Sequence, residues 1–401
     1  MSTNSVHHQV VVVGGGNAGI SVAARLQRAG VTDIAVVEPN ETHSYQPLWT
    51  LVGGGRVSAS KSQRPQSSVM PKGVAWVKDH VVTVDPTAQS LETVGGLVIS
   101  YDQIVVCPGI QLDWGRVPGM ADALTTPAAS SNYRLDLADK TWQNIQDMKS
   151  GSAVFTMPSG PIKCAGAPQK IAYLAADYWR KQGVLDDIDI TVVLPTPGMF
   201  GVKAFSDELD KVVDRYGINV DFNSEMVEVD PDSGTTIIAN NAEGTKRDQH
   251  YDLLHTVPPQ SAPDWIKGSP LAEPDNPAGY VQIDKHTMQH SRFPNVFALG
   301  DVGSSPNSKT GAAIRKQAPV VVENLMAVRN GKAPQAQYDG YASCPLTTAR
   351  NKMLLAEFDY SMQPAPSIPI IDTTHERRDM WLLKRHGLPF LYWNFILTGR
   401  A

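Results

Sequence analysis

The sequence predicts an α/β protein with two tandem Rossmann-like domains and a separate C-terminal segment. Three observations carry this prediction. A glycine-rich strand–turn–helix unit opens the chain, a second such unit begins near residue 153, and an aromatic-rich tail follows residue 335. With 401 residues, the chain is long enough for two or three domains of ordinary size.

The first unit predicts a dinucleotide-binding domain whose first part we place at residues 1–114. The apolar run 10–13 is typical of a buried parallel strand, and helical periodicity follows over 20–29. Between them lies a G-x-G-x-x-G turn made by Gly14, Gly16 and Gly19. The next strand ends at Glu38, whose carboxylate suits ribose hydroxyls. We expect a pyrophosphate at the N-terminus of this helix.

A weak internal sequence repeat predicts the second domain. Residues 101–109 and 251–259 share the pattern Tyr-Asp, apolar strand, Pro/Gly turn. We therefore place a second Rossmann-like unit at 115–260, with strands over 153–156 and 188–194.

A third element returns the chain to the first domain. The strand-like run that starts at Phe293 ends in Gly300-Asp301, and a helix is expected over 311–326. A carboxylate at the end of a strand suits a sugar or ribitol hydroxyl. We assign 261–335 to the second part of the first domain and 336–401 to the C-terminal region.

Composition excludes several classes of function. The net charge is −5 and no Lys/Arg block occurs, so no nucleic-acid partner is expected. No apolar run reaches the length of a membrane-spanning helix, and the N-terminus does not resemble a signal or transit peptide. Three dispersed cysteines provide neither a disulfide framework nor metal-ligand spacing, so we expect a reducing compartment and no metal.

The loop after strand 153–156 departs from the nucleotide-binding pattern. Its sequence, PSGPIKCAGAP, places Pro158, Pro161 and Lys163 where a backbone should approach phosphate. We therefore expect NAD(P)H to bind poorly here. The loop carries Cys164 instead, and a thiol beside a helix N-terminus and Lys163 should have a depressed pKa.

The other two cysteines differ in context. Cys107 lies in the apolar run IVVCPG and is expected to be a buried core residue. Cys344 is predicted to lie in a loop just before an apolar stretch, and only the fold can bring it to Cys164.

The motifs GGGNAG and FALGD and the Tyr-Asp segments resemble the two-dinucleotide-fold, disulfide-reductase-like flavoproteins. The resemblance implies FAD held by the first fold and the late Gly-Asp segment. Lys309 would place positive charge beside the flavin. The residues implied in FAD binding are Gly14, Gly16, Asn17, Ala18, Gly19, Glu38, Gln46, Gly109, Gly300, Asp301, Lys309 and Thr310.

Five further segments, SYQPLWTLVGGG, PIKCAGAPQK, GDVGSSPNSKT, YDGYASCPL and AEFDY, together resemble the two-cysteine type of the sulfide:quinone oxidoreductase family. This resemblance implies that Cys164 and Cys344 oxidise hydrogen sulfide to a persulfide. Cys164 would be the cysteine that passes electrons to FAD. The electrons would continue to ubiquinone or menaquinone, and the sulfur to a thiol, sulfite or cyanide.

The tail DMWLLKRHGLPFLYWNFILTGR suits an interfacial helix, because aromatic residues are flanked by Lys384, Arg385 and Arg400. A core helix or a contact within a homo-oligomer is the alternative. We expect a peripheral protein on the cytoplasmic face of the inner (cytoplasmic) membrane, or on the mitochondrial inner membrane in a eukaryote. Candidate quinone contacts are the ring walls Phe358, Phe390 and Tyr392 and the proton handler Glu357.

Other functions remain open at this point. A type II NADH:quinone dehydrogenase would need a second G-x-G-x-x-G, which the sequence lacks. A flavocytochrome-type sulfide dehydrogenase would need a haem partner and an exported chain. A flavin and thiol redox sensor would control a binding partner without turnover.

Overall fold

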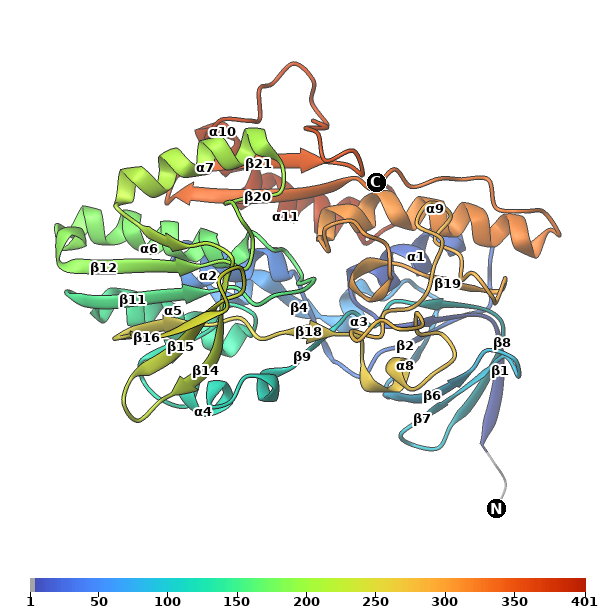
Figure 1. Cartoon of the computed structure of the whole chain (residues 1–401). Coiled ribbons are helices and arrows are strands. Elements are labelled where there is room, and N and C mark those ends of the chain that lie inside the picture. Colours follow the sequence, from blue (N-terminus) through green and yellow to red (C-terminus); the bar gives the residue numbers. More distant parts are fainter. Residues whose placement is uncertain (1–3) are drawn as a thin grey trace.

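The computed structural model describes residues 4–401 and shows two α/β lobes side by side (Figure 1). One lobe holds the N-terminal sheet, the other holds the middle of the chain, and the C-terminal segment lies across the top of both in this view. The predicted α/β fold with two Rossmann-like units is confirmed. Within residues 4–401, no helix is both long and apolar enough to cross a bilayer.

The first lobe is built on a seven-stranded sheet with the order β5-β2-β1-β8-β7-β6, in which β19 also pairs with β8. Its central strands β1, β2, β8 and β19 are parallel, and the run Val10–Val13 is fully buried. Helices α1 and α9 pack against each other. The strands are β1 Ser5–Val13, β2 Ile34–Val37, β5 Ala75–Val77, β6 Val81–Asp85, β7 Ser90–Thr93, β8 Val98–Val106 and β19 Val296–Ala298; the helices are α1 Asn17–Arg28 and α9 Gly311–Arg329.

Two glycines of the first turn are required by close backbone contacts. Gly14 has a φ of +103°, and a Cβ there would lie 2.5 Å from the carbonyl oxygen of Cys107. A Cβ on Gly19 would lie 1.8 Å from the carbonyl oxygen of Gly14. The glycines therefore let α1 approach the strand end closely enough to form the nucleotide turn.

Replacing Gly19 with alanine is expected to destabilise the protein by about 3 kcal/mol and to weaken binding of the expected FAD, because α1 must move away from the turn. Thermal unfolding and the flavin-to-protein absorbance ratio measure both effects. Gly115→Ala is the matched control, since within the described part of the chain no atom lies within 4 Å of a Cβ at that position. Equal melting temperatures for the two variants would contradict this role of Gly19.

The second lobe contains a five-stranded parallel sheet with the order β10-β17-β11-β12-β13. A three-stranded antiparallel sheet, β14-β15-β16, is attached to it. Its strands are β10 Ala129–Ser130, β11 Gly151–Thr156, β12 Ile188–Val193, β13 Asn219–Asp221, β14 Ser224–Asp230, β15 Thr235–Asn240, β16 Thr245–His250 and β17 Leu253–His255; its helices are α5 Leu135–Asp147, α6 Ala167–Gln182 and α7 Lys203–Tyr216.

A short antiparallel ribbon marks where the chain crosses between the lobes. It pairs β9, Gln111–Leu112, with β18, Gln260–Ser261. The predicted domain boundaries after residues 114 and 260 fall beside this ribbon. The remaining short elements are β3 Thr42–Ser44, β4 Gln63–Pro65, α2 Trp49–Gly53, α3 Gln66–Val69, α4 Met120–Ala123, α8 Asp264–Lys267 and the 3₁₀ turns η1 Gln46–Leu48, η2 Ala59–Ser62, η3 Trp114–Arg116, η4 Leu185–Asp187 and η5 Gly300–Val302.

The C-terminal region consists of a hairpin and a helical tail. Strands β20, Ala342–Ala349, and β21, Lys352–Phe358, pair antiparallel above α6 (Figure 1). The tail is α10 Arg378–Leu382, the π-helical turn η6 Leu383–Gly387, α11 Leu388–Leu391 and the π-helical turn η7 Tyr392–Ile396. Cys344 therefore lies within a strand, and the predicted loop is wrong.

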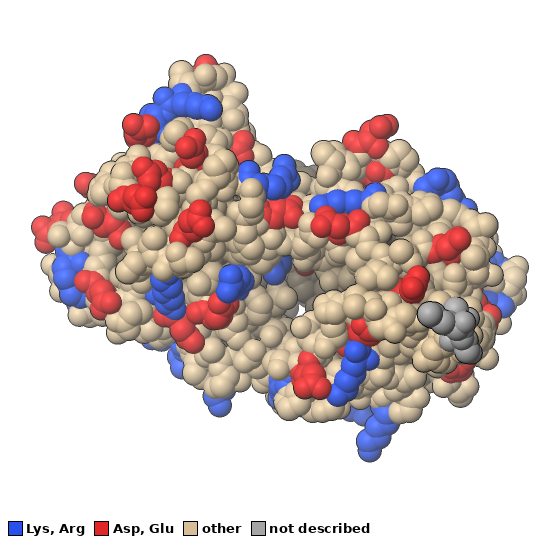
Figure 2. Space-filling view, turned by 90° about the horizontal axis from the view of Figure 1, so that it is seen from below, with Lys and Arg blue, Asp and Glu red and all other residues tan. Residues whose placement is uncertain are grey.

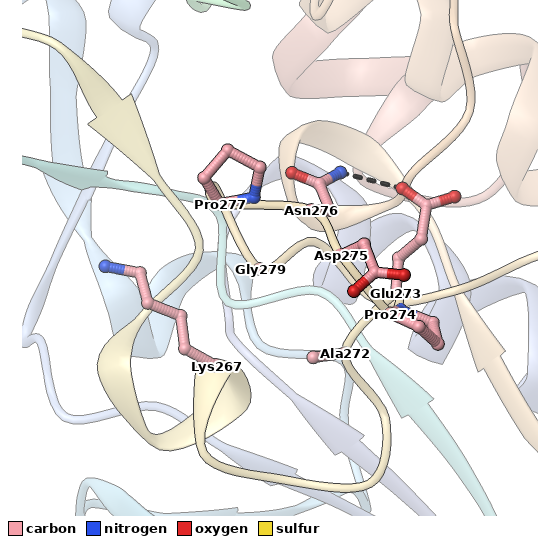
Figure 3. Close-up of a pocket in the computed structure, with 8 residues that line it drawn as sticks. All are labelled: Lys267, Ala272, Glu273, Pro274, Asp275, Asn276, Pro277 and Gly279. Carbon is pink, nitrogen blue, oxygen red and sulfur yellow. Dashed lines mark hydrogen bonds between the residues drawn. The ribbon is translucent and has the colours of Figure 1, made fainter.

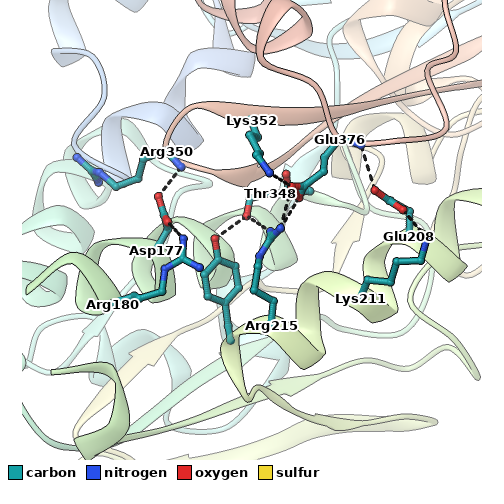
Figure 4. Close-up of polar contacts among 10 residues, drawn as sticks. Asp177, Arg180, Glu208, Lys211, Arg215, Thr348, Arg350, Lys352 and Glu376 are labelled. Atoms are coloured by element: carbon teal, nitrogen blue, oxygen red, sulfur yellow. Dashed lines mark hydrogen bonds and ion pairs between the residues drawn. The ribbon is translucent and has the colours of Figure 1, made fainter. Parts of the chain in front are cut away.

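A network of ion pairs fastens the hairpin to the second lobe (Figure 4). The carboxylate of Asp177, whose side chain is 1% exposed, accepts a hydrogen bond of 2.9 Å from the backbone N–H of Arg350. Glu376 pairs with Arg215 at 2.7 Å and with Lys352 at 2.6 Å. These contacts join the hairpin to the second lobe and hold β20, which carries Cys344, against α6. Breaking them is costly, because removing one partner of a buried pair leaves an uncompensated charge.

Surface charge agrees with the sequence. On the face shown in Figure 2, acidic and basic side chains are interspersed, and no basic tract stands out there.

Candidate active site

A cavity of about 810 Å³ lies where the two lobes and the C-terminal segment meet. Its walls come from the glycine turn before α1, the loop after β19, the Cys164 loop and the tail helix. Its volume falls within the range of small-molecule and cofactor sites. Four lysines line it, and they are Lys163, Lys170, Lys309 and Lys384.

The cofactor side of the cavity contains most of the predicted residues. The residues that line it are Gly16, Asn17, Ala18, Glu38, Gln46, Gly109, Gly300, Asp301, Lys309 and Thr310. Gly14 and Gly19 lie behind the lining and shape the turn. No atom of residues 4–401 lies within 4 Å of a Cβ built on Gly16 or Gly109, so the cradle leaves room for a bound dinucleotide. The residues present therefore fit FAD.

Glu38 and α9 provide further features of this cradle. Glu38 accepts hydrogen bonds of 2.7 Å from the backbone N–H groups of Gly15 and Asn40, which fixes its carboxylate at the end of β2. The side chain of Thr310 caps α9 by accepting from the N–H of Ala313 at 3.2 Å. The positive end of α9 therefore borders the cavity.

Lys309 is buried at the start of α9. Its ammonium donates to the carbonyl oxygen of Gly303 at 2.9 Å and lies 4.0 Å from the ring centroid of Tyr280. Burial lowers the pKa of Lys309 to about 8, although the carboxylates of Asp301 and Glu273 oppose that shift. Lys309 is thus a buried, hydrogen-bonded cation in the cavity wall and not a solvated surface residue.

The structure brings Cys164 and Cys344 together. Cys164 lies between β11 and α6, Cys344 lies in β20, and their sulfur atoms are 3.8 Å apart. Cys164 has a φ of +53°, which is uncommon for a residue with a side chain. Its backbone is held by a 2.8 Å bond from its N–H to the carbonyl oxygen of Lys309. The loop that replaces the second glycine turn thus holds Cys164 in a strained conformation beside Cys344.

Lys170 is the cation that contacts the thiol. Its ammonium, on the first turn of α6, lies 3.0 Å from the Cys164 sulfur and is buried. The hydrogen bond from Cys344 and the charge of Lys170 hold the pKa of Cys164 well below its ordinary value. The same hydrogen bond and burial raise the pKa of Cys344 well above its ordinary value. In the reduced pair, Cys164 is the thiolate and Cys344 the neutral thiol.

Lys384 approaches the pair from the tail. Its side chain is buried, its ammonium lies 3.3 Å from the carbonyl oxygen of Pro345, and burial lowers its pKa to about 7. The expectation that Lys384 flanks an interfacial helix is wrong, because its side chain is buried and points inward. Lys163 interacts with the charge of Cys164 but does not contact its sulfur, since the Lys163 ammonium contacts Gln46 at 2.7 Å.

Cys107 is a core residue, as the sequence predicts. It is 5% exposed, lies at the end of β8, and burial raises the pKa of its thiol. Its sulfur is 3.8 Å from the carbonyl oxygen of Gly14.

An apolar end of the cavity is formed by the hairpin and the tail. Its apolar lining residues are Leu355, Ile368, Leu383, Leu388, Leu391 and Ile396. The hairpin contributes a carboxylate here, Glu357, which is 3% exposed. It accepts hydrogen bonds of 2.5 Å from the hydroxyl of Tyr341 and 3.1 Å from the backbone N–H of Ser367. The Tyr341 hydroxyl also lies 3.1 Å from the hydroxyl of exposed Ser367.

The three predicted ring walls occupy different environments. Tyr392 lines the cavity and donates its hydroxyl proton to Nε2 of His43 at 2.6 Å, because Nδ1 of His43 faces the acceptors Gly15 and Gln66. Phe358 does not line the cavity: it lies next to Glu357 in β21, so its side chain points to the opposite face. Phe390 also misses the lining and is 62% exposed. The predicted roles of Phe358 and Phe390 as walls of the quinone site are therefore wrong.

A separate hollow of about 480 Å³ lies on the loop that follows α8 (Figure 3). Asn276 donates to Glu273 at 2.7 Å and accepts from the backbone N–H of Ala278 at 2.9 Å. The polar groups of Asn276 are thus paired within the loop, and the hollow contributes nothing to the cysteine site.

Comparison with known proteins decides the family. Residues 8–318 match the family model described as pyridine nucleotide-disulphide oxidoreductase. The chain is 41% identical over 395 residues to the mitochondrial sulfide:quinone oxidoreductase of Mus musculus, covering 98% of this chain and 87% of that protein. The protein of the same name from Dictyostelium discoideum is 42% identical over 395 residues, covering 98% and 86%. The chain belongs to the sulfide:quinone oxidoreductase family.

A solved structure supports the fold of this family member. The X-ray structure of the sulfide:quinone oxidoreductase from Aquifex aeolicus superimposes with a TM-score of 0.79 at 19% identity, covering 98% of this chain and 92% of that one. Proteins of this family are FAD-dependent oxidoreductases, so the resemblance found in the sequence and its FAD prediction are confirmed.

Sequence reasoning missed several residues of this site. Lys170 and Lys384 lie beside the thiols, and Tyr341 lies beside Glu357. The signal for Lys170 was available, because it closes the KCAGAPQK motif and begins an apolar helix in which a lysine is unusual. No local signal marks Lys384 or Tyr341, which reach the site only through the fold.

Proposed function

We propose that this protein oxidises hydrogen sulfide with the Cys164–Cys344 pair and that the electrons leave through FAD to a membrane quinone. The observation that carries the proposal is the pair itself: two sulfur atoms 3.8 Å apart, with Lys170 3.0 Å from one of them, on a loop that stands in place of a second glycine turn. The names of the relatives agree with sulfide oxidation coupled to quinone.

The different pKa values of the two thiols favour one direction of sulfide attack. Hydrosulfide forms a new S–S bond to Cys344, the bond between Cys344 and Cys164 breaks, and its electron pair leaves on Cys164. Cys164 is the better leaving group, because Cys344 and Lys170 lower its pKa. Cys344 then carries the persulfide and Cys164 is a thiolate. Once the outer sulfur has passed to an acceptor, the freed Cys344 thiolate bonds to Cys164, and this bond re-forms the disulfide and releases two electrons.

Bound FAD would supply the two-electron acceptor that links the thiolate to a quinone. The chain's own contribution is to hold the cofactor in the glycine cradle, with Lys309 and the N-terminus of α9 as positive charge nearby. The leucine-lined end of the cavity suits the ring of ubiquinone or menaquinone. Glu357 is the group placed to move a proton there.

Tyr341→Phe is expected to slow ubiquinone reduction by about 100-fold, because Glu357 loses the hydroxyl that connects it to exposed Ser367. Turnover with ferricyanide, which accepts electrons without protons, should stay near the wild-type rate. Equal losses with both acceptors would show a structural role for Tyr341 instead.

Peripheral membrane attachment is proposed for the tail. Leu382, Phe390 and Phe395 are exposed by 54%, 62% and 38% on the helical tail, whereas Tyr392 and Trp393 are buried against the first lobe. The tail therefore both packs on the protein and presents apolar side chains outward. We place the protein on the cytoplasmic face of the inner (cytoplasmic) membrane, or on the mitochondrial inner membrane in a eukaryote.

The double variant Leu382→Ser, Phe390→Ser is expected to weaken binding to anionic liposomes by about tenfold or more, because two apolar side chains no longer leave water. Val94→Ser is the matched control, since Val94 is 66% exposed on a different part of the chain. Deleting the tail is a poorer test, because deletion also removes buried Tyr392. Unchanged liposome binding by the double variant would contradict the assignment.

Steady-state assays test the proposed activity. The FAD-loaded protein should reduce a short-chain ubiquinone when sulfide and sulfite are supplied, through many turnovers, and should not do so with NADH. Turnover with NADH would favour a type II NADH dehydrogenase, and a single turnover with sulfide would favour a redox sensor.

A further inference from the structure

Two arginines lie against Trp381 of the helical tail without a carboxylate partner. Arg56 follows α2 in the first lobe, and Arg385 lies in η6 of the tail. The guanidinium carbon of Arg56 is 5.3 Å from the centroid of the Trp381 ring, and that of Arg385 is 5.2 Å from it. Among residues 4–401, neither guanidinium forms an ion pair. The fold thus gathers two uncompensated positive charges on one indole ring.

Two N–H groups of this cluster are buried and unpaired. Trp381 is 6% exposed, and its indole N–H has no hydrogen-bond partner among the described residues. The Nε–H of Arg56 is buried without a partner as well. Neither residue lines the cavity of about 810 Å³, so the cofactor and the quinone do not complete them. Because a buried donor is costly to leave unpaired, these groups indicate an acceptor that comes from outside the chain.

Arg350 adds a third positive charge from the hairpin. Its backbone N–H donates to Asp177, whereas its guanidinium extends the other way and donates to two carbonyl oxygens at the end of α2 (Figure 4). Burial and the charge of Arg56 lower the pKa of Arg350 to about 10. Burial and the charge of Arg385 lower the pKa of Arg56 in turn. The arginines therefore repel one another, and an anion bound beside them would relieve that repulsion.

Asp177 does not neutralise this cluster. Its charge favours the protonated forms of Arg56 and Arg350. Its two oxygens are already paired, with Arg180 at 2.5 Å and Lys181 at 2.9 Å. The cluster thus keeps a net positive charge.

The cluster lies beside a side chain that the tail presents outward. Leu382 is 54% exposed and follows Trp381 directly, and Arg385 is three residues further along the same helical stretch. Side chains three residues apart are neighbours on a helix surface. The phosphates of a bilayer lie just outside its acyl chains, so a leucine that enters the acyl chains would bring the arginines to the depth of the phosphates.

We propose that Arg56, Arg385 and the indole N–H of Trp381 bind the phosphate group of an anionic phospholipid. The proposal rests on the membrane attachment proposed for the tail and names the class of lipid that this attachment selects. Guanidinium groups form paired hydrogen bonds to phosphate oxygens, and the indole supplies a further donor. The ammonium of phosphatidylcholine would face the same arginines, so lipids with a net negative charge are favoured.

Flotation of the FAD-loaded protein with lipid vesicles tests the site. Vesicles of phosphatidylcholine alone are compared with vesicles that also contain phosphatidylglycerol, and the wild type should bind the second kind about tenfold more tightly or better. Arg56→Gln and Arg385→Gln should each remove most of this preference and leave binding to phosphatidylcholine unchanged, because the exposed apolar side chains stay in place. Arg400→Gln is the matched control, since Arg400 is an exposed arginine of the same tail and the charge change is the same.

Trp381→Phe tests the site without a change of charge. It keeps an aromatic ring under the two guanidiniums and removes only the N–H, so the preference for phosphatidylglycerol should fall by about threefold or more. Melting temperature and flavin content should match the wild type in all of these variants, since the altered side chains lie outside the cavity lining. Full preference for phosphatidylglycerol in Trp381→Phe and Arg385→Gln would overturn the site.

Further outcomes separate this inference from the proposed function and from other sources of phosphate. Equal losses in Arg400→Gln and Arg385→Gln would show a diffuse charge effect and overturn the site. Release of the wild type by inorganic phosphate at constant ionic strength would assign the arginines to free phosphate and overturn the lipid. A wild type that binds both kinds of vesicle equally overturns this inference alone, whereas one that binds neither shows that the proposed membrane attachment itself fails.

Discussion

Serine in place of Cys164 or of Cys344 should lower the rate of flavin reduction by sulfide by about 1000-fold or more. The reason is that sulfide needs a sulfur–sulfur bond to attack, and neither single cysteine can form it within the protein. Stopped-flow absorbance of the flavin under anaerobic conditions measures the rate directly.

Cys107→Ala is the control for this experiment. Cys107 is buried at the end of β8 and is not part of the sulfur pair, so the variant should keep most of the wild-type rate. Normal sulfide oxidation by either serine variant would contradict the two-cysteine account.

Replacing Lys170 with methionine is the second large effect. The ammonium 3.0 Å from the Cys164 sulfur favours the thiolate, so its removal should raise the pKa of Cys164. Below the new pKa, each unit leaves about tenfold less thiolate, so activity near pH 7 should fall about 10- to 100-fold and recover toward alkaline pH.

The rate of iodoacetamide alkylation of the reduced protein as a function of pH measures this pKa. Lys170→Arg should shift it less than Lys170→Met, since the positive charge is kept. Lys384→Met should raise the pKa of Cys164 less than Lys170→Met does. The pKa of Lys384 is about 7, so part of its positive charge is already lost at neutral pH. An alkylation profile that Lys170→Met leaves in place would contradict the role of Lys170.

The first lobe could be predicted from sequence because its information is local. A buried valine run, three glycines and an acid at fixed spacing specify the strand, turn and helix that the structure shows. The Cys164 loop lacks the glycine pattern, and this difference is also visible in a short stretch of sequence. It led to the expectation of a reactive thiol, which the contacts with Lys170 and Cys344 support.

Long-range features could not be predicted in this way. The loop predicted around Cys344 is a strand in the structure. Pro345 is tolerated there because β20 and β21 form a two-stranded sheet with open edges, where a missing N–H costs little. Phe358 was chosen by residue type, and only the strand register shows that it faces away from Glu357. The inward direction of Lys384 depends on how the tail packs, which its amphipathic pattern does not reveal.

The central claim is that sulfur chemistry at Cys164 has replaced nicotinamide binding in the second lobe. Its most direct test is anaerobic addition of sulfide to the FAD-loaded protein, with NADH added to a parallel sample, while flavin absorbance is followed. The account predicts bleaching by sulfide, no bleaching by NADH, and recovery of the oxidised spectrum when a quinone is added. Bleaching by NADH without sulfide would contradict it.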